Sequence, residues 1–295
     1  GRFPSVPNYV IVTDSSCDLN EEIAEQLELK VLPLSFHLDG KEHKNELDWP
    51  EITPENFYKK LREGSTCTTS AVNMEYFKNL METYLKNGQD VLCPCFSSGL
   101  SGTYQAAKMA GEELTALYPE RKIYVIDTLC ASLGQGLLIW YAANQRLNGK
   151  SIDEVRDWIE ENKLHLCHWF TVDDLNFLKR GGRVNSAAAL FGTVLGIKPV
   201  MHVDNNGHLI PISKVRGRKA SLDALVDHMA QTATDPKNQT VFISHGDSKE
   251  DAEYVANQIK ERLGTKTVFI NFIGPVIGAH SGPGTIALFF LGTER

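Results

Sequence analysis

A serine- and glycine-rich turn begins the stretch FSSGLSGTYQAAKMA at residues 96–110, which lies between an apolar run and a helical pattern. It places three serines, two glycines and a threonine where a strand at 90–95 is expected to become a helix. The first turn of a helix has unpaired backbone N–H groups and carries the positive end of the helix dipole. Hydroxyl groups at the same point add hydrogen-bond donors. The stretch therefore predicts an anion site without a fixed charge, formed by Ser97 and Ser98.

Two further polar segments could face the same ligand. One reads STCTTS at 65–70, in a predicted loop just before a helix, and the other is a glycine- and proline-rich predicted loop at 273–284 that carries His280. Loops at the carboxyl ends of neighbouring parallel strands converge on one crevice. A polar residue before a helix is often only a cap, and a lone histidine is more often structural. The hypothesis of a binding site therefore depends on all three segments together.

Alternation of apolar runs with helical patterns predicts the elements that position these residues in the first half of the chain. Strands are expected at 9–13, 31–36, 90–95 and 123–126. Helices are expected at 21–28, 54–62, 74–86, 102–117 and 132–147. Strands that alternate with helices in this way are typical of an α/β layer with a Rossmann-like parallel sheet.

The second half has a different pattern, with longer strands and fewer helices. A helix at 151–162 and the apolar run 165–170 precede strands expected at 197–203, 208–214, 240–245, 267–272 and 285–291, with helices at 219–232 and 249–263. The sequence Asn205-Asn206-Gly207 indicates a hairpin turn. We therefore predict a Rossmann-like α/β domain at 9–160 and an α+β domain with a mixed, largely antiparallel sheet at 161–295. No linker marks the boundary, so the domains could exchange segments.

Composition excludes several classes of partner. The chain has 295 residues, is 42% hydrophobic, and carries a formal net charge of -7. A negative chain has no electrostatic footprint for nucleic acid, and the same charge limits any membrane contact to a transient one. No apolar run approaches the length of a membrane span, and no secretory pattern is present at the amino end. These features predict a globular cytoplasmic protein.

Cofactor and metal motifs are incomplete in this sequence. The segment 149–151 reads GKS but lacks the upstream glycine of a phosphate-binding loop, and 282–287 satisfies G-x-G-x-x-A only by letter because a strand follows it. Six cysteines without a C-x-x-C pair predict reduced thiols, with Cys93 and Cys95 packed on a buried strand. We therefore expect neither a metal nor a cofactor.

Several segments resemble the DegV family of bacterial fatty-acid-binding proteins. They occur in the family's order and span nearly the whole chain, and they are VTDSS at 12–16, SSGLSGTYQ at 97–105, DDLNFLKRGGRV at 173–184, IKP at 197–199 and GPVIGAHSGPG at 274–284. The resemblance implies a non-catalytic protein that holds a long-chain fatty acid between two domains. It further implies that the protein presents the carboxylate to a separate fatty-acid kinase, which forms acyl phosphate.

The resemblance also implies roles for individual residues. Those expected to meet the carboxylate are Thr69, Ser70, Ser97, Ser98 and His280. Those expected to meet the kinase are Lys179, Arg180 and Arg183. The family commonly has Thr-Ser-Gln-Pro in its second loop, whereas this chain has Ala71 and Val72 after Thr69 and Ser70.

Two alternatives remain open from the sequence. A serine-dependent lipid hydrolase or acyltransferase would use Ser97, Ser98 or Ser101 as nucleophile and His280 as base. No acidic residue adjoins His280 in the sequence to orient it, and Thr103 replaces the last glycine of the G-x-S-x-G elbow. A regulatory or scaffold protein would need no ligand at all.

Overall fold

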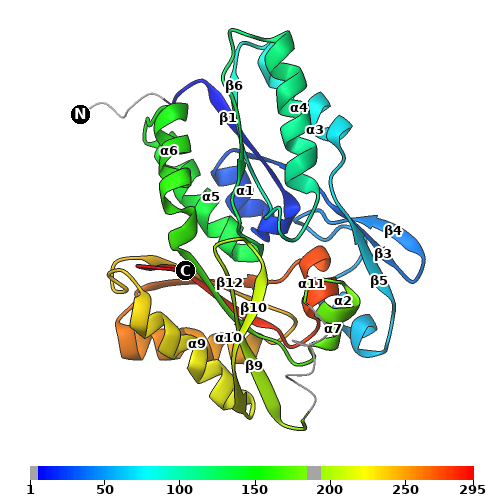
Figure 1. Ribbon diagram of the computed structural model, residues 1–295, viewed down its shortest axis with the longest axis vertical. Helices are drawn as coiled ribbons and strands as arrows, with labels where there is room; N and C mark the ends of the chain where they lie inside the picture. Colours follow the sequence, from blue (N-terminus) through cyan, green and yellow to red (C-terminus); the bar gives the residue numbers. More distant parts are fainter. Residues whose placement is uncertain (1–5, 185–193) are drawn as a thin grey trace.

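A computed structural model describes residues 6–184 and 194–295 (Figure 1). The N-terminal part is built on a four-stranded parallel sheet with the strand order β2-β1-β6-β7. These strands are β1 (Tyr9–Asp14), β2 (Leu29–Leu32), β6 (Asp90–Cys95) and β7 (Ile123–Asp127). The helices of this part are α1 (Glu21–Gln26), α3 (Met74–Lys86), α4 (Thr103–Leu117), α5 (Ser132–Leu147) and α6 (Ile152–Asn162). This arrangement confirms the predicted Rossmann-like layer.

The C-terminal part is built on a six-stranded mixed sheet with the order β10-β9-β8-β13-β11-β12. Its pairs are antiparallel except for β11 with β12. The elements are β8 (Leu166–Thr171), β9 (Ile197–Val203), β10 (Leu209–Arg216), α9 (Arg218–Thr232), β11 (Thr240–His245), α10 (Lys249–Leu263), β12 (Thr267–Phe272) and β13 (Ile286–Leu291). The largely antiparallel α+β architecture predicted for this half is confirmed.

A small antiparallel sheet, β4-β3-β5, lies beside these two sheets together with three helices. Its strands are β3 (Ser35–Leu38), β4 (Lys41–Lys44) and β5 (Cys67–Ser70), and the helices are α2 (Pro54–Arg62), α7 (Asn176–Arg180) and α11 (Pro275–Ser281). Two expectations are corrected here. The apolar run 31–36 is divided between β2 and β3, which belong to different sheets, and residues 67–70 form a strand that pairs with β3 where a loop was expected.

The glycine- and proline-rich segment 273–284 is also not a simple loop, because residues 275–281 form helix α11. Pro275 occupies the first turn of the helix, where its missing N–H is not needed. Gly278 packs against the ring of Tyr58 from α2, and a side chain at position 278 would occupy the space of that ring. The glycine therefore allows close packing of two helices.

Helix α5 connects the two large sheets. Most of its residues are buried, and it contacts β8, β11 and β13 while it packs in the N-terminal core. Two short 3-10 helices, η1 (Ser15–Cys17) and η2 (Lys163–His165), complete the described elements. In the described ranges, no helix is both long enough and apolar enough to span a membrane.

Candidate functional site

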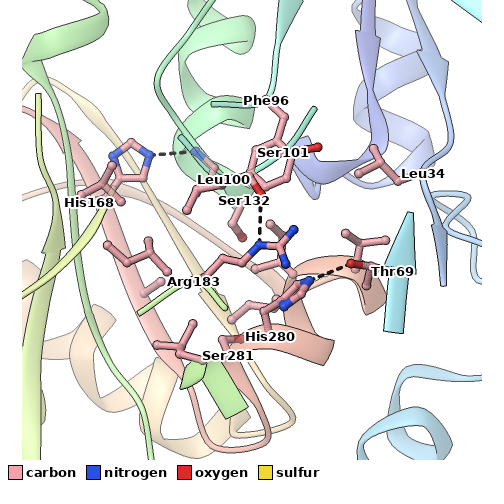
Figure 2. A pocket seen from close by; sticks show the side chains of 18 of the residues that line it. Leu34, Thr69, Phe96, Leu100, Ser101, Ser132, His168, Arg183, His280 and Ser281 are labelled. Carbon is pink, nitrogen blue, oxygen red and sulfur yellow. Dashed lines mark hydrogen bonds between the residues drawn. The ribbon is translucent and has the colours of Figure 1, made fainter. Parts of the chain in front are cut away.

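A cavity lies where the N-terminal sheet, the C-terminal sheet and helix α11 meet (Figure 2). It encloses about 850 Å³ of empty space, its open mouth included. Residues from both halves of the chain, from Leu34 to Phe289, form its lining. Most of the wall is apolar, including Leu34, Phe96, Leu100, Phe170, Leu178, Val203, Leu209, Ile273, Val276 and Phe289. A mainly apolar lining of this kind is typical of sites for small molecules.

One end of the cavity is polar, and Thr69 and His280 meet there. Thr69 is on β5, His280 is on α11, and their Oγ1 and Nε2 atoms are 2.7 Å apart (Figure 2). Burial, and secondarily the positive charge of Arg183, lowers the pKa of His280 to about 4. The imidazole is therefore neutral at physiological pH. Its Nδ1 has no hydrogen-bond partner among the described residues.

Arg183 lies at the same polar end, not on an outer surface. It is half-buried, and its Nε donates a hydrogen bond to the backbone oxygen of Leu100 at 3.1 Å. A second hydrogen bond runs from Nη1 to the backbone oxygen of Gly181. Within residues 6–184 and 194–295, no carboxylate forms an ion pair with Arg183. The site thus contains a fixed positive charge that the sequence analysis had assigned to kinase contact.

Of the three serines in the turn between β6 and α4, Ser101 is the one that lines the cavity. Its hydroxyl accepts a hydrogen bond from the backbone N–H of Thr103 at 3.1 Å and lies 2.9 Å from the Thr103 hydroxyl. Gly102 lines the cavity next to it. The turn therefore brings one hydroxyl, at the start of α4, to the polar end.

Ser97 and Ser98 are not among the residues that line the cavity. Ser97 is fully buried, and its hydroxyl donates to the backbone oxygen of Gly207 at 2.9 Å. Ser98 is exposed, and its backbone N–H donates to Asp127 Oδ1 at 3.1 Å. Ser97 thus ties the β9–β10 hairpin to the N-terminal sheet. The structure does not bring these two serines together with Thr69 and His280.

Close approach of the hairpin also explains Gly99. A Cβ atom added at this position would lie 2.8 Å from the backbone oxygen of Gly207 and 2.9 Å from that of Asn206. Any larger residue would push the hairpin away from the turn. Gly99 is therefore needed for the close packing of the two halves of the chain.

Two other serines line the cavity, and only the first of them, Ser70, is a residue that the sequence analysis predicts for the site. Ser70 and the neighbouring Ala71 are exposed lining residues at the end of β5. Ser281, next to His280, is buried in the lining, and its hydroxyl has no hydrogen-bond partner among the described residues. Unpaired buried polar atoms are costly, so a polar ligand group within reach of Ser281 would offset part of this cost.

His168 lies across the cavity from Thr69 (Figure 2). Both of its ring nitrogens contact backbone groups of the protein. Its Nε2 accepts the backbone N–H of Ala131 at 3.1 Å, and its Nδ1 lies 3.0 Å from the backbone oxygen of Leu166. Burial lowers the pKa of His168 well below its usual value. A neutral imidazole in this setting presents little polarity to the cavity, so this end is suited to an apolar tail.

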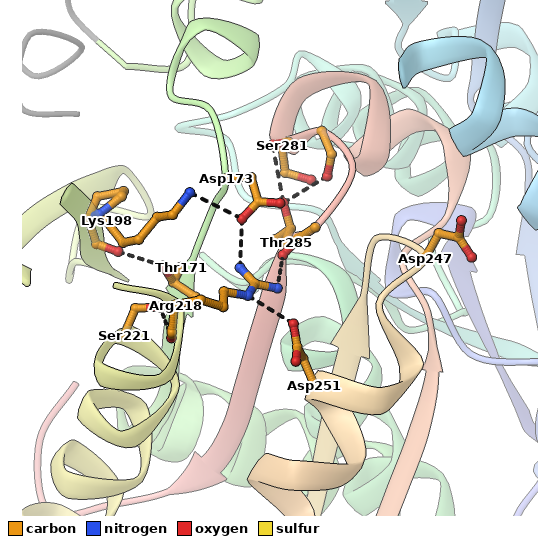
Figure 3. Close-up of polar contacts among 12 residues, drawn as sticks. Thr171, Asp173, Lys198, Arg218, Ser221, Asp247, Asp251, Ser281 and Thr285 are labelled. Carbon is orange, nitrogen blue, oxygen red and sulfur yellow. Dashed lines mark hydrogen bonds and ion pairs between the residues drawn. The ribbon is translucent and has the colours of Figure 1, made fainter. Parts of the chain in front are cut away.

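A charged network holds the chain that follows α11 (Figure 3). Arg218, the first residue of α9, donates to Asp173 at 3.0 Å, to Asp251 at 2.9 Å and to the backbone oxygen of Gly284. Lys198 is 3.6 Å from the same Asp173 carboxylate. The network lies behind Ser281 and Thr285 of the cavity wall, so it fixes the backbone that carries them.

Among the residues that the structure describes, no Asp or Glu side chain lines the cavity. In addition, no group of three or more His, Cys, Asp or Glu side chains in the described ranges is arranged to hold a metal ion. The polar end instead combines hydroxyls, a neutral imidazole and one guanidinium. This set of groups can bind an anion, and the remaining walls can bind an apolar chain.

Residues 8–293 match the profile of a family described as "Uncharacterised protein, DegV family". A DegV domain-containing protein of Clostridium perfringens is 47% identical over 287 residues, which cover 97% of this chain and 98% of the relative. The chain belongs to the DegV family. The resemblance seen in the sequence is thereby confirmed.

Solved DegV structures share the fold. A fatty-acid-binding DegV family protein from Thermus thermophilus is 30% identical, with a TM-score of 0.87 over 97% of this chain and 100% of that one. The Streptococcus pneumoniae fatty acid kinase B3 protein, loaded with linoleic acid, has a TM-score of 0.83 at 17% identity, over 97% of this chain and 99% of that one. The second likeness shows the fold alone.

Proposed function

We propose that the protein binds a long-chain fatty acid in the cavity and holds its carboxylate at the polar end. The observation that carries this proposal is the separation of a mainly apolar wall from one end that gathers Thr69, Ser101, Arg183 and His280. Each buried methylene contributes roughly 0.8 kcal/mol before ordering costs, so the wall can supply most of the affinity. The polar end then sets the orientation. The related Thermus protein, which binds fatty acid, supports the same reading.

Within this proposal the head-group contacts differ from those first expected. Thr69, Ser70 and His280 stay as predicted, and Ser101 replaces Ser97 and Ser98 because its hydroxyl is the one in the lining. The guanidinium of Arg183 supplies the charge that a carboxylate prefers. Ala71, which stands where the family commonly has glutamine, lines the cavity, so the mouth is more apolar here than a glutamine would make it.

The geometry gives less support to the serine hydrolase or acyltransferase. The hydroxyl of Ser101 bonds to Thr103, and the imidazole of His280 bonds to Thr69, so none of the predicted serine nucleophiles is paired with His280 as a base. The described part of the lining also has no carboxylate that could orient the imidazole. The proposed role is therefore non-catalytic. In it, a separate kinase supplies a nucleoside triphosphate, the bound carboxylate attacks the terminal phosphorus, and nucleoside diphosphate leaves.

Purified protein is expected to carry a long-chain fatty acid without a covalent bond, because the cavity buries the chain and the polar end satisfies the carboxylate. Organic extraction followed by mass spectrometry measures the ligand, and intact-protein mass spectrometry under denaturing conditions tests for an acyl adduct. A serine adduct would support the enzyme. Absence of any acyl species, with no uptake of added fatty acid, would rule out the carrier.

Two matched serine variants test the head-group assignment. Ser101→Ala is expected to weaken fatty-acid binding about ten- to a hundredfold, since a hydrogen bond to a charged group contributes about 1.5–3 kcal/mol. Ser98→Ala removes the same hydroxyl three residues away, outside the lining, and is expected to bind like the wild type. Equal affinities for the two variants would contradict the assignment.

Contact with the kinase is proposed for the exposed end of α7. Lys179 and Arg180 are exposed there and lie close in the chain to Arg183 at the head-group end. Lys179→Glu is expected to lower acyl phosphate formation by an added fatty-acid kinase about three- to tenfold at low salt, because surface charges steer docking. The difference should shrink as salt rises, and the affinity for fatty acid should stay unchanged.

Lys266→Glu provides the matched control for this charge reversal. Lys266 is exposed in the loop that precedes β12 and lines neither the cavity nor the α7 surface. The Lys266→Glu substitution changes the net charge by the same amount as Lys179→Glu, so any long-range electrostatic effect on the kinase would appear in both variants. A rate of acyl phosphate formation that falls equally in both would place the docking surface elsewhere.

A further inference from the structure

The charged network behind the cavity wall is centred on one guanidinium group, that of Arg218 (Figure 3). Its three nitrogen atoms contact three separate segments of the chain. Nε donates to Asp251 of α10 at 2.9 Å, Nη1 donates to Asp173 at 3.0 Å, and Nη2 donates to the backbone oxygen of Gly284. Asp173 precedes α7, and Gly284 follows α11. Arg218 therefore connects the two short helices at the polar end of the cavity, although it is not among the residues that line the cavity.

The contact at Gly284 fixes the end of α11. Gly284 has a φ of 84°, and a Cβ atom at this position would lie 2.0 Å from Oδ2 of Asp173, so only glycine fits here. The next residue, Thr285, donates a hydrogen bond from its hydroxyl to the backbone oxygen of Ser281 at 3.1 Å. The turn after α11 is thus joined both to the charged network and to the last turn of the helix, which carries His280.

Helices α7 and α11 pack directly against each other, with glycines at the contact. A Cβ atom added at Gly282 would lie 2.6 Å from Cδ2 of Phe177 on α7. A Cβ atom added at Gly181, the residue after α7, would lie 2.1 Å from Nδ1 of His280. Arg183, which carries the positive charge of the polar end, is two residues further along the chain. A change in how α7 lies on α11 would therefore move the guanidinium of Arg183 relative to the imidazole of His280.

We infer that Arg218 is a positioning residue for the head group of the bound fatty acid. By holding the chain before α7 and the chain after α11 on one planar group, it sets the position of Arg183 relative to His280. The inference rests on the proposed function, which assigns these two side chains to the carboxylate. Arg218 acts through the two helices, since it does not line the cavity. Hydrogen bonds to a carboxylate depend on distance and direction, so a small shift of either helix would lower the affinity for the carboxylate.

Arginine is suited to this role because its planar guanidinium presents several N–H groups in a fixed arrangement. The ammonium group of lysine is a point charge on a flexible chain. A lysine at position 218 keeps the charge that faces Asp173 but cannot reproduce the set of three contacts. Arg218→Lys therefore separates the charge of the residue from its geometry.

The test compares a long-chain fatty acid with the primary alcohol of the same chain length, each in competition with a fluorescent fatty acid for the whole chain. Arg218→Gln is expected to lower the affinity for the acid about tenfold, the lower end of the effect of one lost hydrogen bond to a charged group. The affinity for the alcohol is expected to change less than about twofold, because the apolar wall is unchanged and the alcohol carries no charge. Arg218→Lys is expected to lose as much affinity for the acid as Arg218→Gln.

Arg262→Gln is the matched control. Arg262 lies at the other end of α10 from Asp251 and forms an ion pair with Asp227 of α9 at 2.8 Å. The substitution removes one arginine and one ion pair between the same two helices, and it is expected to leave both affinities unchanged. If Arg218→Gln does not fold, a second pair of variants gives the answer. Asp173→Ala releases α7 and is expected to weaken binding of the acid but not of the alcohol, whereas Asp251→Ala, on the side of α10, is expected to affect neither.

Four results would overturn the inference. Equal losses of acid and alcohol in Arg218→Gln would mean that Arg218 only stabilises the fold, and no loss of either would mean that it does not position the head group. Wild-type affinity for the acid in Arg218→Lys would assign the effect to charge alone. Equal effects of Asp173→Ala and Asp251→Ala would show that the contact before α7 has no special role. If the wild type binds no fatty acid, or binds the acid no better than the alcohol, the proposed function itself fails.

Discussion

Ala131→Phe is expected to lower the affinity for a long-chain fatty acid about a hundredfold. Ala131 lines the cavity beside His168, on the side opposite Thr69, where the proposed acyl tail ends. A phenyl ring there would displace about four methylenes, and each contributes roughly 0.8 kcal/mol, so about 3 kcal/mol of binding free energy is lost. Competition against a fluorescent fatty acid measures the affinity.

Chain length supplies the internal control for this variant. A fatty acid about four carbons shorter does not reach the added ring and is expected to keep its wild-type affinity. Ala131→Ser is the matched substitution, because it adds one oxygen at a position that caps α5 without filling the cavity. Loss of short and long acids alike, or no loss of either, would show that the tail does not end at Ala131.

The sequence predicted most elements well where periodicity reflects burial. The helices expected at 54–62, 74–86, 132–147 and 249–263 have the same bounds in the structure, as do the strands expected at 197–203, 240–245 and 267–272. In α2 and α3 a stripe of apolar residues alternates with a charged face, and an asparagine or threonine caps the first turn. Such local signals need no knowledge of the rest of the chain.

Helix α11 was missed because its composition is governed by distant contacts. Glycine and proline usually interrupt helices, so 273–284 was interpreted as a loop. In the structure, Gly278 accommodates Tyr58, which is far away in the sequence, and the hydroxyl of Tyr58 donates to the backbone oxygen of Ile273. A small residue is needed at position 278 because of this tertiary contact, and the local sequence pattern does not reveal the contact.

For the candidate site, the sequence predicts which segments come together but not which side chain of each segment faces the cavity. The turn after β6, the end of β5 and α11 do converge on one cavity. Which serine of the turn faces that cavity depends on the hairpin at Gly207, which binds the hydroxyl of Ser97. The available signal for Ser101 was its position just before Gly102 and Thr103, at the start of the helix.

The place of the Arg183 charge could likewise not be predicted from the sequence. Taken alone, a run of basic residues with two glycines is typical of a solvated turn, and the family resemblance groups Arg183 with Lys179 and Arg180 as residues expected to meet the kinase. In the structure, the backbone oxygen of Leu100 accepts a hydrogen bond from Arg183 and directs it beside His280. The acceptor lies in the other half of the chain, so the direction of the side chain could not be deduced from its neighbours in sequence.

Asp18→Asn is expected to stabilise the protein more at pH 8 than at pH 5, by about 3 kcal/mol. Asp18 is buried between the two halves, where Ser132 donates to its Oδ2 at 2.6 Å and also lies 3.0 Å from Ser244 of β11. Burial raises the pKa of Asp18 from its usual 3.8 to about 7, against the hydrogen bonds from Ser132 and the Gly274 backbone. Since Ser132 also lines the cavity between the two halves, this carboxyl is part of the frame that holds the cavity wall.

The sign follows from proton uptake. The folded state keeps a proton on Asp18 up to about pH 7, whereas the unfolded chain releases it near 3.8. Stability from this group is therefore full below 3.8 and is lost as pH rises toward 7, by about 4 kcal/mol in all. Asparagine keeps the shape and an acceptor for Ser132 but does not titrate, so the loss is absent in the variant. Buried histidines contribute to both proteins alike and cancel in the difference.

Urea unfolding of both proteins at pH 5 and pH 8 gives the two differences in free energy of unfolding. The exposed Asp48, changed to Asn, is the matched control, and the difference between this variant and the wild type is expected to be the same at both pH values. A difference for Asp18→Asn that is also independent of pH would mean that Asp18 is ionised in the folded protein at pH 5. The interface between the two halves would then hold a permanent negative charge next to Ser132, and the wall of the cavity would be charged throughout the physiological range.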